Sequence, residues 1–416
     1  MASIAAGVRG SHLAAQLGAG PHSARIVAVA EPRADRREAF AARHGIPVAA
    51  RFESWEDLCA RGPEFDAAII ATMDNQHTGP VLACLGLGRH VLVEKPLADT
   101  MDGARRIVRE QRQSGRIVAV CHTLRHMSAF RKVQDIVAGG ALGRVIHAEH
   151  MEAIGHLRFT HNYVRGRWAR EAGNTSLLLH KCSHDIDFLA WLIGAPCLRV
   201  SSFGCLAHFK PECAPPGAAL RCLDGCRRLD TCPYSAVRLY VDNDLTGRLE
   251  DLGGARTREE RREAVRQGPF GVCVWHAGND VVDHQIVSMK FDGGIIATCA
   301  MTGYSASHGR RTRLQGDEGE LLFDEAAETI TIRRFSSGDA EVIHAPRPGA
   351  YHPEDRGIVA EWLSAIRDAS RGVTVDAGEA ARTLALVLAA EQSRRENRTV
   401  EMSEVDFNGP PVKDGA

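Results

Sequence analysis

Between Ile4 and Cys121, short apolar runs alternate with segments that have the periodicity of helices. The runs that we interpret as buried strands lie at 25–31, 65–72, 91–93 and 116–121. The helices predicted between them lie at 11–17, 35–44, 55–58, 80–88 and 102–114. Strands that alternate with helices at this spacing form a parallel sheet with helices on both faces. We therefore predict an α/β domain with a Rossmann-type parallel sheet at residues 1–122.

The second half of the chain has a different pattern. Segments that read as antiparallel strands lie at 143–150, 198–205, 283–291, 295–301, 320–323 and 329–334. Asp292-Gly293-Gly294 separates two of them and is typical of a hairpin turn. We expect residues 123–416 to form an α+β domain with a large, mostly antiparallel open sheet. A cysteine-rich insertion is expected at about 205–270.

Composition excludes several classes of protein. The chain has 416 residues and a net charge of −1, which argues against a nucleic-acid partner. No segment approaches the ~18 consecutive apolar residues of a membrane span. The first residues, 1–7, lack the basic and apolar regions of a signal peptide, so we expect a cytoplasmic protein without a membrane partner.

The segment from Ile4 to His12 has the form Ala-x-Gly-x-x-Gly, with Ala5 where the first glycine usually lies. It is typical of the strand-to-helix turn of a dinucleotide-binding unit. Gly7 allows the backbone to approach a pyrophosphate, and Gly10 allows the helix to pack close to the sheet. The residues predicted to bind the cofactor here are Gly7, Val8, Arg9 and Gly10.

Glu31 follows the next predicted strand, at the place where a ribose-binding acid is expected. A carboxylate there accepts hydrogen bonds from the ribose hydroxyls and repels a 2′-phosphate, which favours NAD over NADP. Arg33 and Arg36 lie nearby and weaken that preference. The alternative is a solvated acid at a strand end.

Lys95 lies in Glu94-Lys95-Pro96, directly after the strand 91–93. Proline disfavours helix in the residue before it, so Lys95 is expected at the strand end, facing the crevice. A surface turn is the alternative for this tripeptide alone. The polar ends of the other predicted strands would share the same edge, which favours the crevice.

These motifs resemble the glucose–fructose oxidoreductase / inositol dehydrogenase / MocA (Gfo/Idh/MocA) family. The residues that carry the resemblance are the turn at 7–10, Thr72-x-Asp74-x-x-His77 and the segment Gly88 to Ala98. The resemblance implies that Lys95 positions the nicotinamide ribose and the substrate hydroxyl. It also implies cofactor contacts for Glu94, Thr72, Asn75 and His77.

The segment 176–192 is predicted to be one buried helix with a dense polar cluster. The family has an Asp-x-x-x-His-x-x-Asp pattern on this helix, with the histidine as the proton-transfer residue. His184 and Asp187 match it, whereas His180 replaces the first acid. The chain instead has Lys-x-x-His-Asp, so we predict Lys181 and His184 as catalytic residues. His180 and Asp185 are predicted to contact the substrate, as are Arg167 and Trp168 just upstream.

Four cysteines lie close together in the insertion: Cys213, Cys222, Cys226 and Cys232. Thiolates at such spacing can form a structural zinc site, with His208 as a possible replacement for Cys213. Unligated thiols and disulfides are the alternatives.

Three functions remain open from the sequence. The first is an NAD(P)-dependent oxidoreductase that acts on a secondary hydroxyl of a sugar, inositol or sugar derivative. The second is an NAD-dependent enzyme that cleaves glycosides through transient oxidation, elimination and re-reduction. The third is a cofactor-binding sensor. The resemblance also implies a homodimer or homotetramer, because the family commonly buries its open sheet between subunits.

Overall fold

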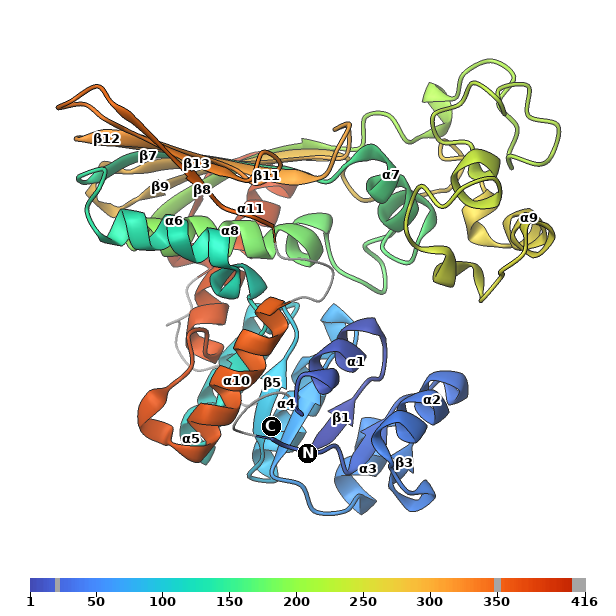
Figure 1. Ribbon diagram of the computed structural model, residues 1–416, viewed down its shortest axis with the longest axis horizontal. Coiled ribbons are helices and arrows are strands. Elements are labelled where there is room, and N and C mark those ends of the chain that lie inside the picture. The colour runs from blue at the N-terminus through green and yellow to red at the C-terminus, as the bar shows by residue number, and fades with distance from the viewer. Residues whose placement is uncertain (19–22, 348–352, 406–416) are drawn as a thin grey trace.

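The computed structural model describes residues 1–18, 23–347 and 353–405. Two sheets organise the chain, one of six strands and one of nine. The smaller sheet lies in the lower body of Figure 1 and the larger sheet crosses the upper body. The predicted fold class, a Rossmann-type sheet followed by a mostly antiparallel open sheet, is confirmed.

The six-stranded sheet is parallel throughout and has the order β3-β2-β1-β4-β5-β6. Its strands are β1 (Ala2–Ile4), β2 (Ala28–Ala30), β3 (Arg51–Phe52), β4 (Ala67–Ile70), β5 (His90–Val93) and β6 (Val118–Val120). The helices of this domain are α1 (Val8–Ala15), α2 (Ala34–His44), α3 (Trp55–Arg61), α4 (Thr78–Gly86) and α5 (Met101–Ser114). The strand order reverses at β1 and β4, which is where open α/β sheets bind ligands.

Local sequence explains where these elements begin and end. Every residue of β4 is buried, as expected for a strand covered on both faces. Helix α5 begins where the Thr100 hydroxyl accepts a hydrogen bond from the Gly103 N–H. It ends at Gly115, which adopts a left-handed conformation with φ of 64°.

The nine-stranded sheet has the order β14-β13-β12-β11-β7-β10-β9-β8-β15. Its strands are β7 (Val145–Ala153), β8 (Cys197–Cys205), β9 (His284–Phe291), β10 (Ile296–Thr302), β11 (Gly309–Gly316), β12 (Gly319–Asp324), β13 (Thr329–Arg334), β14 (Ala340–His344) and β15 (Val400–Glu401). Only β7 and β10 pair in parallel. Buried and exposed residues alternate along β9, so one face packs against helices and the other is open. The helices of this part are α6 (Ser128–Ala138), α7 (His156–Phe159), α8 (Ser183–Ile193), α9 (Arg258–Gln267), α10 (Pro353–Arg367) and α11 (Ala377–Glu396).

The end of the chain returns to the first domain. Helix α10 contacts α1 and β5, and α11 contacts α5 and β6 (Figure 1). The Val120 N–H also donates to the Val375 carbonyl at 3.0 Å. The predicted boundary at residue 122 therefore separates the two sheets, but α10 and α11 connect both bodies.

Among the α-helices and strands of the described ranges, seven were not predicted from the sequence: β3, β11, β14, β15, α7, α9 and α10. Strand β11 contains Arg310, Arg311 and Arg313, so its alternation is hidden by charge. Strand β14 lies at the sheet edge and is almost fully exposed, so it lacks an apolar face. Within the three described ranges, no helix is both long enough and apolar enough to cross a membrane.

Candidate functional site

The turn between β1 and α1 presents backbone N–H groups at the carboxyl edge of the parallel sheet. Gly7 is the N-cap of α1, so Val8 and Arg9 provide the first helical N–H groups. A Cβ at Gly10 would lie 2.3 Å from the Ala5 carbonyl oxygen, so only glycine fits there. Ala5 has φ of 75°, a strained conformation for alanine that costs about 1–3 kcal/mol. The turn therefore keeps the geometry of a phosphate-binding loop although its first glycine is replaced.

Glu31 lies buried beside this turn, directly after β2. Its Oε2 accepts a hydrogen bond from the Ala6 N–H at 2.9 Å, and its Oε1 accepts one from the Arg33 N–H at 3.1 Å. A cavity of about 430 Å³ opens along the carboxyl ends of β1, β2 and β4, lined in part by Ala5, Ala30, Pro32 and Thr72. The turn, the acid and the cavity together fit the adenosine and pyrophosphate of a dinucleotide.

Arg9 connects the turn to two distant carboxylates. Its Nε donates to Glu94 Oε1 at 2.7 Å, and its two terminal nitrogens donate to Asp355 at 2.8 Å. Asp355 is fully buried in α10 and was not predicted as a site residue. These ion pairs hold the turn, the end of β5 and α10 in one arrangement.

Lys95 leaves the end of β5 and meets the segment that precedes α8. Its Nζ donates a hydrogen bond to the His180 carbonyl oxygen. The His180 Nδ1–H donates to Asp74 Oδ2 at 2.8 Å, and its ring stacks on Trp168 with centroids 3.5 Å apart. Burial and the charge of Lys95 lower the pKa of His180 to about 4. His180 is therefore neutral at pH 7 and serves as a donor to Asp74.

Asp74 is a residue that the sequence did not single out for the site. Burial opposes its ionisation, but His180 and then Lys95 lower its pKa to about 2. It therefore carries a negative charge beside Lys95 at neutral pH. Its place in the Thr72-x-Asp74-x-x-His77 motif was the signal that would have identified it.

The predicted single helix at 176–192 is interrupted by a π-helical turn, Leu178–Cys182. The wider turn rotates His180 away from the residues of α8 that follow, a feature frequent at functional sites. His184 then lies beside His122, with ring centroids 5.8 Å apart. Burial, and then the charge of Lys95, lower the pKa of His184 well below its ordinary value. Its Nδ1 is buried without a hydrogen-bond partner, so the neutral ring has acceptor capacity available.

Asp187 anchors α8 rather than joining His180 on one face. Arg125 donates two hydrogen bonds to its carboxylate at 2.9 and 2.8 Å, and Thr383 donates a third at 2.8 Å. His122 Nδ1 lies 3.5 Å from the same carboxylate. Asp187 therefore positions the helix that carries His184.

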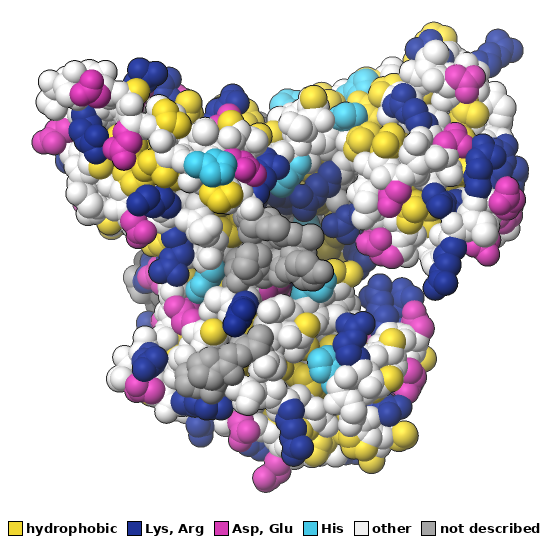
Figure 2. All heavy atoms as spheres, viewed as in Figure 1, with side chains coloured by type: hydrophobic (Ala, Val, Ile, Leu, Met, Phe, Trp, Pro, Cys, Tyr) yellow, Lys and Arg dark blue, Asp and Glu magenta, His cyan; other side chains and the backbone are white. Residues whose placement is uncertain are grey.

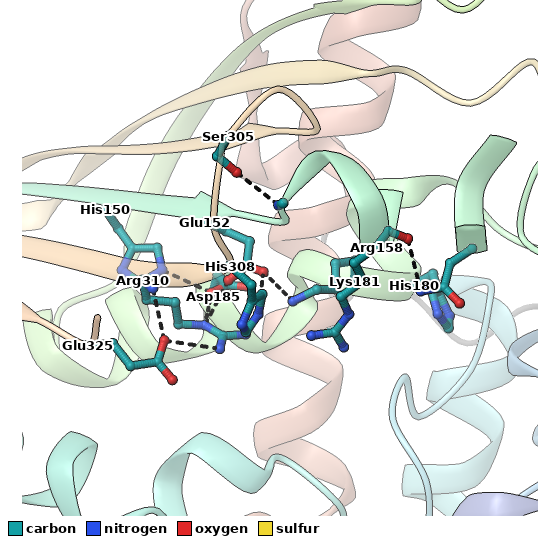
Figure 3. A network of polar contacts seen from close by, with 12 residues as sticks. His150, Glu152, Arg158, His180, Lys181, Asp185, Ser305, His308, Arg310 and Glu325 are labelled. Carbon is teal, nitrogen blue, oxygen red and sulfur yellow. Dashed lines mark hydrogen bonds and ion pairs between the residues drawn. The ribbon is translucent and has the colours of Figure 1, made fainter. Parts of the chain in front are cut away.

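A buried ion network continues from Lys181 into the large sheet (Figure 3). Lys181 is paired with Glu152, which also lies 3.0 Å from the Nε of Arg310. The Arg310 Nε donates to Asp185 Oδ1 at 2.6 Å, and His150 Nε2 lies 2.9 Å from the same oxygen. Burial raises the pKa of both carboxyls, but Arg310 together with the other donors around them lowers both pKa values.

Side chains from both bodies therefore converge on one region. Lys95 and Asp74 come from the parallel sheet, whereas His180 and His184 come from the chain leading into and through α8. Figure 2 shows the surface indented between the two bodies, with basic and histidine side chains gathered there. This arrangement can place a neutral imidazole and an ammonium against one bound molecule.

Comparison with known proteins agrees with this geometry. The sequence model of an oxidoreductase family with an NAD-binding Rossmann fold matches residues 3–122. The model of the GFO/IDH/MocA C-terminal domain matches residues 130–322. The chain belongs to the Gfo/Idh/MocA family.

Individual relatives of this Gfo/Idh/MocA chain are distant. YteT of Bacillus subtilis is 24% identical over 270 residues, 64% of this chain and 62% of YteT. The 1,5-anhydro-D-fructose reductase of Ensifer adhaerens is 31% identical over 169 residues, 40% of this chain and 49% of the reductase. The matches thus span about half to three-fifths of these relatives' lengths. The structure of an NAD-binding oxidoreductase from Klebsiella pneumoniae shares the fold, with a TM-score of 0.70 at 16% sequence identity. The superposition covers 96% of this chain and 98% of the Klebsiella chain.

The structure gives protein partners to two residues that were predicted to contact the cofactor or substrate of this Gfo/Idh/MocA chain. His77 is fully buried, and its ring nitrogens lie 2.6 Å from the Pro96 carbonyl and 3.3 Å from the Thr72 carbonyl. Asp185 is fully buried and bonded to Arg310, so its predicted contact with a substrate stays a prediction. Both side chains hold the loops and helix behind the site.

The remaining predicted residues are placed as follows. The amide of Asn75 donates to the Gly173 carbonyl at 3.1 Å, which links the cofactor side to the loop before the π-turn. Trp168 lies at the site through its stacking on His180. Arg167 is exposed, and its nearest carboxylate is Asp251 at 3.9 Å. Contact with a substrate stays a prediction for Arg167.

The predicted zinc ligands do not form a finished site. Cys213 donates to the Ala207 carbonyl at 3.4 Å and does not line the cavity shared by Cys222, Cys226 and Cys232. The His208 ring packs among aromatic side chains. Among the described residues, no three His, Cys, Asp or Glu side chains are arranged to hold a metal ion as they stand. The predicted set with Cys213 or His208 is therefore not supported.

Proposed function

We propose that this chain is an NAD-dependent dehydrogenase that transfers a hydride between the cofactor and a secondary hydroxyl of a sugar-type substrate. One observation carries the proposal: Lys95, just after β5, donates a hydrogen bond to the His180 carbonyl on the turn that leads into α8, and burial together with the Lys95 charge lowers the pKa of His184 on that helix. The name of the Ensifer relative, a 1,5-anhydro-D-fructose reductase, supports a sugar-type substrate.

The side chains divide the chemistry between them. Bound NAD supplies the hydride acceptor at the nicotinamide ring. His184 takes the hydroxyl proton as general base, because its lowered pKa keeps the ring neutral at pH 7. The Lys95 ammonium donates a hydrogen bond to the same oxygen and stabilises the alkoxide charge that develops on it. In the reverse direction, protonated His184 returns the proton.

Glu31 supports NAD rather than NADP as the cofactor. Its carboxylate is buried at the end of β2, where a 2′-phosphate would meet negative charge. Arg36 opposes this preference, because its guanidinium lies close to the turn and its positive charge would attract a 2′-phosphate. Its Nη1 would lie 3.8 Å from a Cβ placed at Gly7. The expected preference is a higher kcat/KM with NAD.

The test is a panel of free sugars, inositols and aryl glycosides, each assayed with NAD and with NADP. Net formation of NADH supports the dehydrogenase. Release of aglycone without net NADH would replace it with redox-assisted glycoside cleavage. Cofactor binding without turnover on any compound would favour a sensor.

The protonation of His184 gives a prediction that needs no substrate. We expect its ring to stay neutral as the pH falls through the ordinary histidine value of 6.5, because burial and Lys95 lower its pKa. The measurement is an NMR titration of ring resonances, assigned with His184→Gln. Exposed His344 provides an internal reference resonance in the same spectra. Protonation of His184 near neutral pH would remove it as the proposed base.

The open face of the large sheet supports self-association of the chain. Met151, Ile286, Ile296 and Leu322 are each 39–42% exposed on it, beside a hollow of about 640 Å³. We propose that a second copy covers this face. Leu322→Glu should lower the molar mass measured by light scattering towards that of a monomer. Val48→Glu, on the first domain, is the matched control, and equal masses for the two variants would contradict the proposal.

A further inference from the structure

The chain between β8 and β9 forms a lobe that projects from the upper body, in light green to yellow in Figure 1. From residue 214 to residue 235, the lobe contains no helix or strand but only turns, loops and one β-bridge, which pairs Arg221 with Val272. Turns of this kind carry few of the backbone hydrogen bonds that hold helices and strands. Local turn hydrogen bonds and a small apolar cluster around Cys222 hold this segment.

Four thiols line one small cavity inside this lobe: Cys222, Cys226, Cys232 and Cys273. The β-bridge brings the two ends of the set together. The Cys222 N–H donates to the Gly271 carbonyl at 2.9 Å, and the Cys273 N–H donates to the Leu220 carbonyl at 2.9 Å. Cys273, which is distant in the sequence, therefore lines this cavity, whereas Cys213 does not.

Hydrogen-bond donors without partners surround the same cavity. Arg165 Nη1, Trp275 Nε1 and Ser235 Oγ are buried and unpaired, and all three residues line the cavity. The residues are only 5%, 6% and 1% exposed. A buried donor without an acceptor is costly, so three around one cavity indicate a missing acceptor, a role that thiolate sulfurs can fill.

Cys222 already has the surroundings of a thiolate ligand. Its Sγ accepts hydrogen bonds from Arg165 Nη2 at 3.7 Å and from the Ala236 N–H at 3.5 Å. Donors of this kind around sulfur stabilise metal-bound thiolates. Neutral thiols are poor acceptors and would not use the unpaired donors, whereas four thiolates on a divalent cation would.

We propose that Cys222, Cys226, Cys232 and Cys273 bind one Zn²⁺ as thiolates, with Arg165 and Trp275 donating hydrogen bonds to the sulfurs. The four thiols release their protons on binding, and the guanidinium offsets part of the net negative charge. The cavity of about 10 Å³ holds a single ion and leaves no room for an iron–sulfur cluster. Since the thiols are not yet arranged as a closed site, the turns at 222–232 must draw together around the ion.

The experiment is metal analysis of the full-length protein, purified without chelators and under reducing conditions. We expect about one zinc per chain. Cys273→Ser and Cys226→Ser should each lower the zinc content at least tenfold. Cys213→Ser is the matched control, because this thiol lies in the same lobe but outside the cavity, and it should keep its zinc.

If a cysteine variant does not fold, an absorption measurement on the wild-type chain still tests the proposal. Protein loaded with Co²⁺ in place of zinc should show the sulfur-to-cobalt absorption of a tetrahedral thiolate complex. Less than about a tenth of a zinc per chain, or a disulfide among the four cysteines in the reduced protein, would overturn the proposal. Zinc loss in Cys213→Ser with retention in Cys273→Ser would overturn the ligand set. None of these readouts depends on the proposed dehydrogenase activity.

Discussion

Replacing Lys95 with methionine should lower kcat by about 10²–10³-fold on the substrate that the wild-type chain oxidises. Methionine keeps much of the side-chain volume but removes the ammonium that stabilises the alkoxide. The fold should persist, because Lys95 is only partly buried and its ammonium donates a hydrogen bond to a backbone carbonyl, that of His180. Steady-state kinetics and thermal unfolding of the two proteins check this expectation.

The same substitution should also change a protonation equilibrium. The Lys95 charge lowers the pKa of both His180 and His184, so Lys95→Met should raise both pKa values. An NMR titration of the variant measures this without turnover. Exposed Lys132→Met is the control and should change neither kcat nor the titrations. Wild-type kcat in Lys95→Met would remove Lys95 from the site.

Arg310→Met should destabilise the protein by about 3–5 kcal/mol at pH 7. The Arg310 guanidinium is buried and neutralises Asp185 and Glu152, both fully buried, so its loss leaves buried carboxylates without their main counter-ion. Urea unfolding should show a lower midpoint with an unchanged m-value. Arg310→Lys, which keeps a positive charge, should lose less stability.

The pH dependence of this loss has a definite sign. In the wild type, the lowered pKa values of Glu152 and Asp185 provide stability above their ordinary pKa, which is lost as the pH falls through the folded-state values. In Arg310→Met, burial raises both pKa values, so acid neutralises the orphaned carboxylates. The difference in unfolding free energy between the wild type and Arg310→Met should therefore become smaller as the pH falls towards 4. Arg313→Met on the exposed face is the control, and equal stability losses in the two variants would contradict a special role for Arg310.

The alternating strands and the turn at 7–10 were readable from local sequence, because a strand buried on both faces must be apolar throughout. The edge strand β14 and the arginine-rich β11 were not, because their residues lack the alternating apolar pattern that identifies strands. Helix α10 was not predicted either, and neither was the ion pair between its Asp355 and Arg9. Such ion pairs join residues far apart in the chain, so no local pattern records them.

Within the site, the sequence by itself identified the candidate residues: Lys95 at a strand end, and Lys181 and His184 on a polar stretch of a buried helix. Their catalytic roles stay predictions. Only the tertiary structure decided what each one contacts. His180 lies in the π-turn and contacts Asp74 and Trp168. Where α8 packs against the large sheet, Lys181 is paired with Glu152, and Asp185 is paired with Arg310. The sequence likewise identified the cysteine cluster, but only the fold brings Cys273 to it. Residue types follow from chemistry along the chain, whereas charge pairing and burial depend on neighbours that only folding brings together.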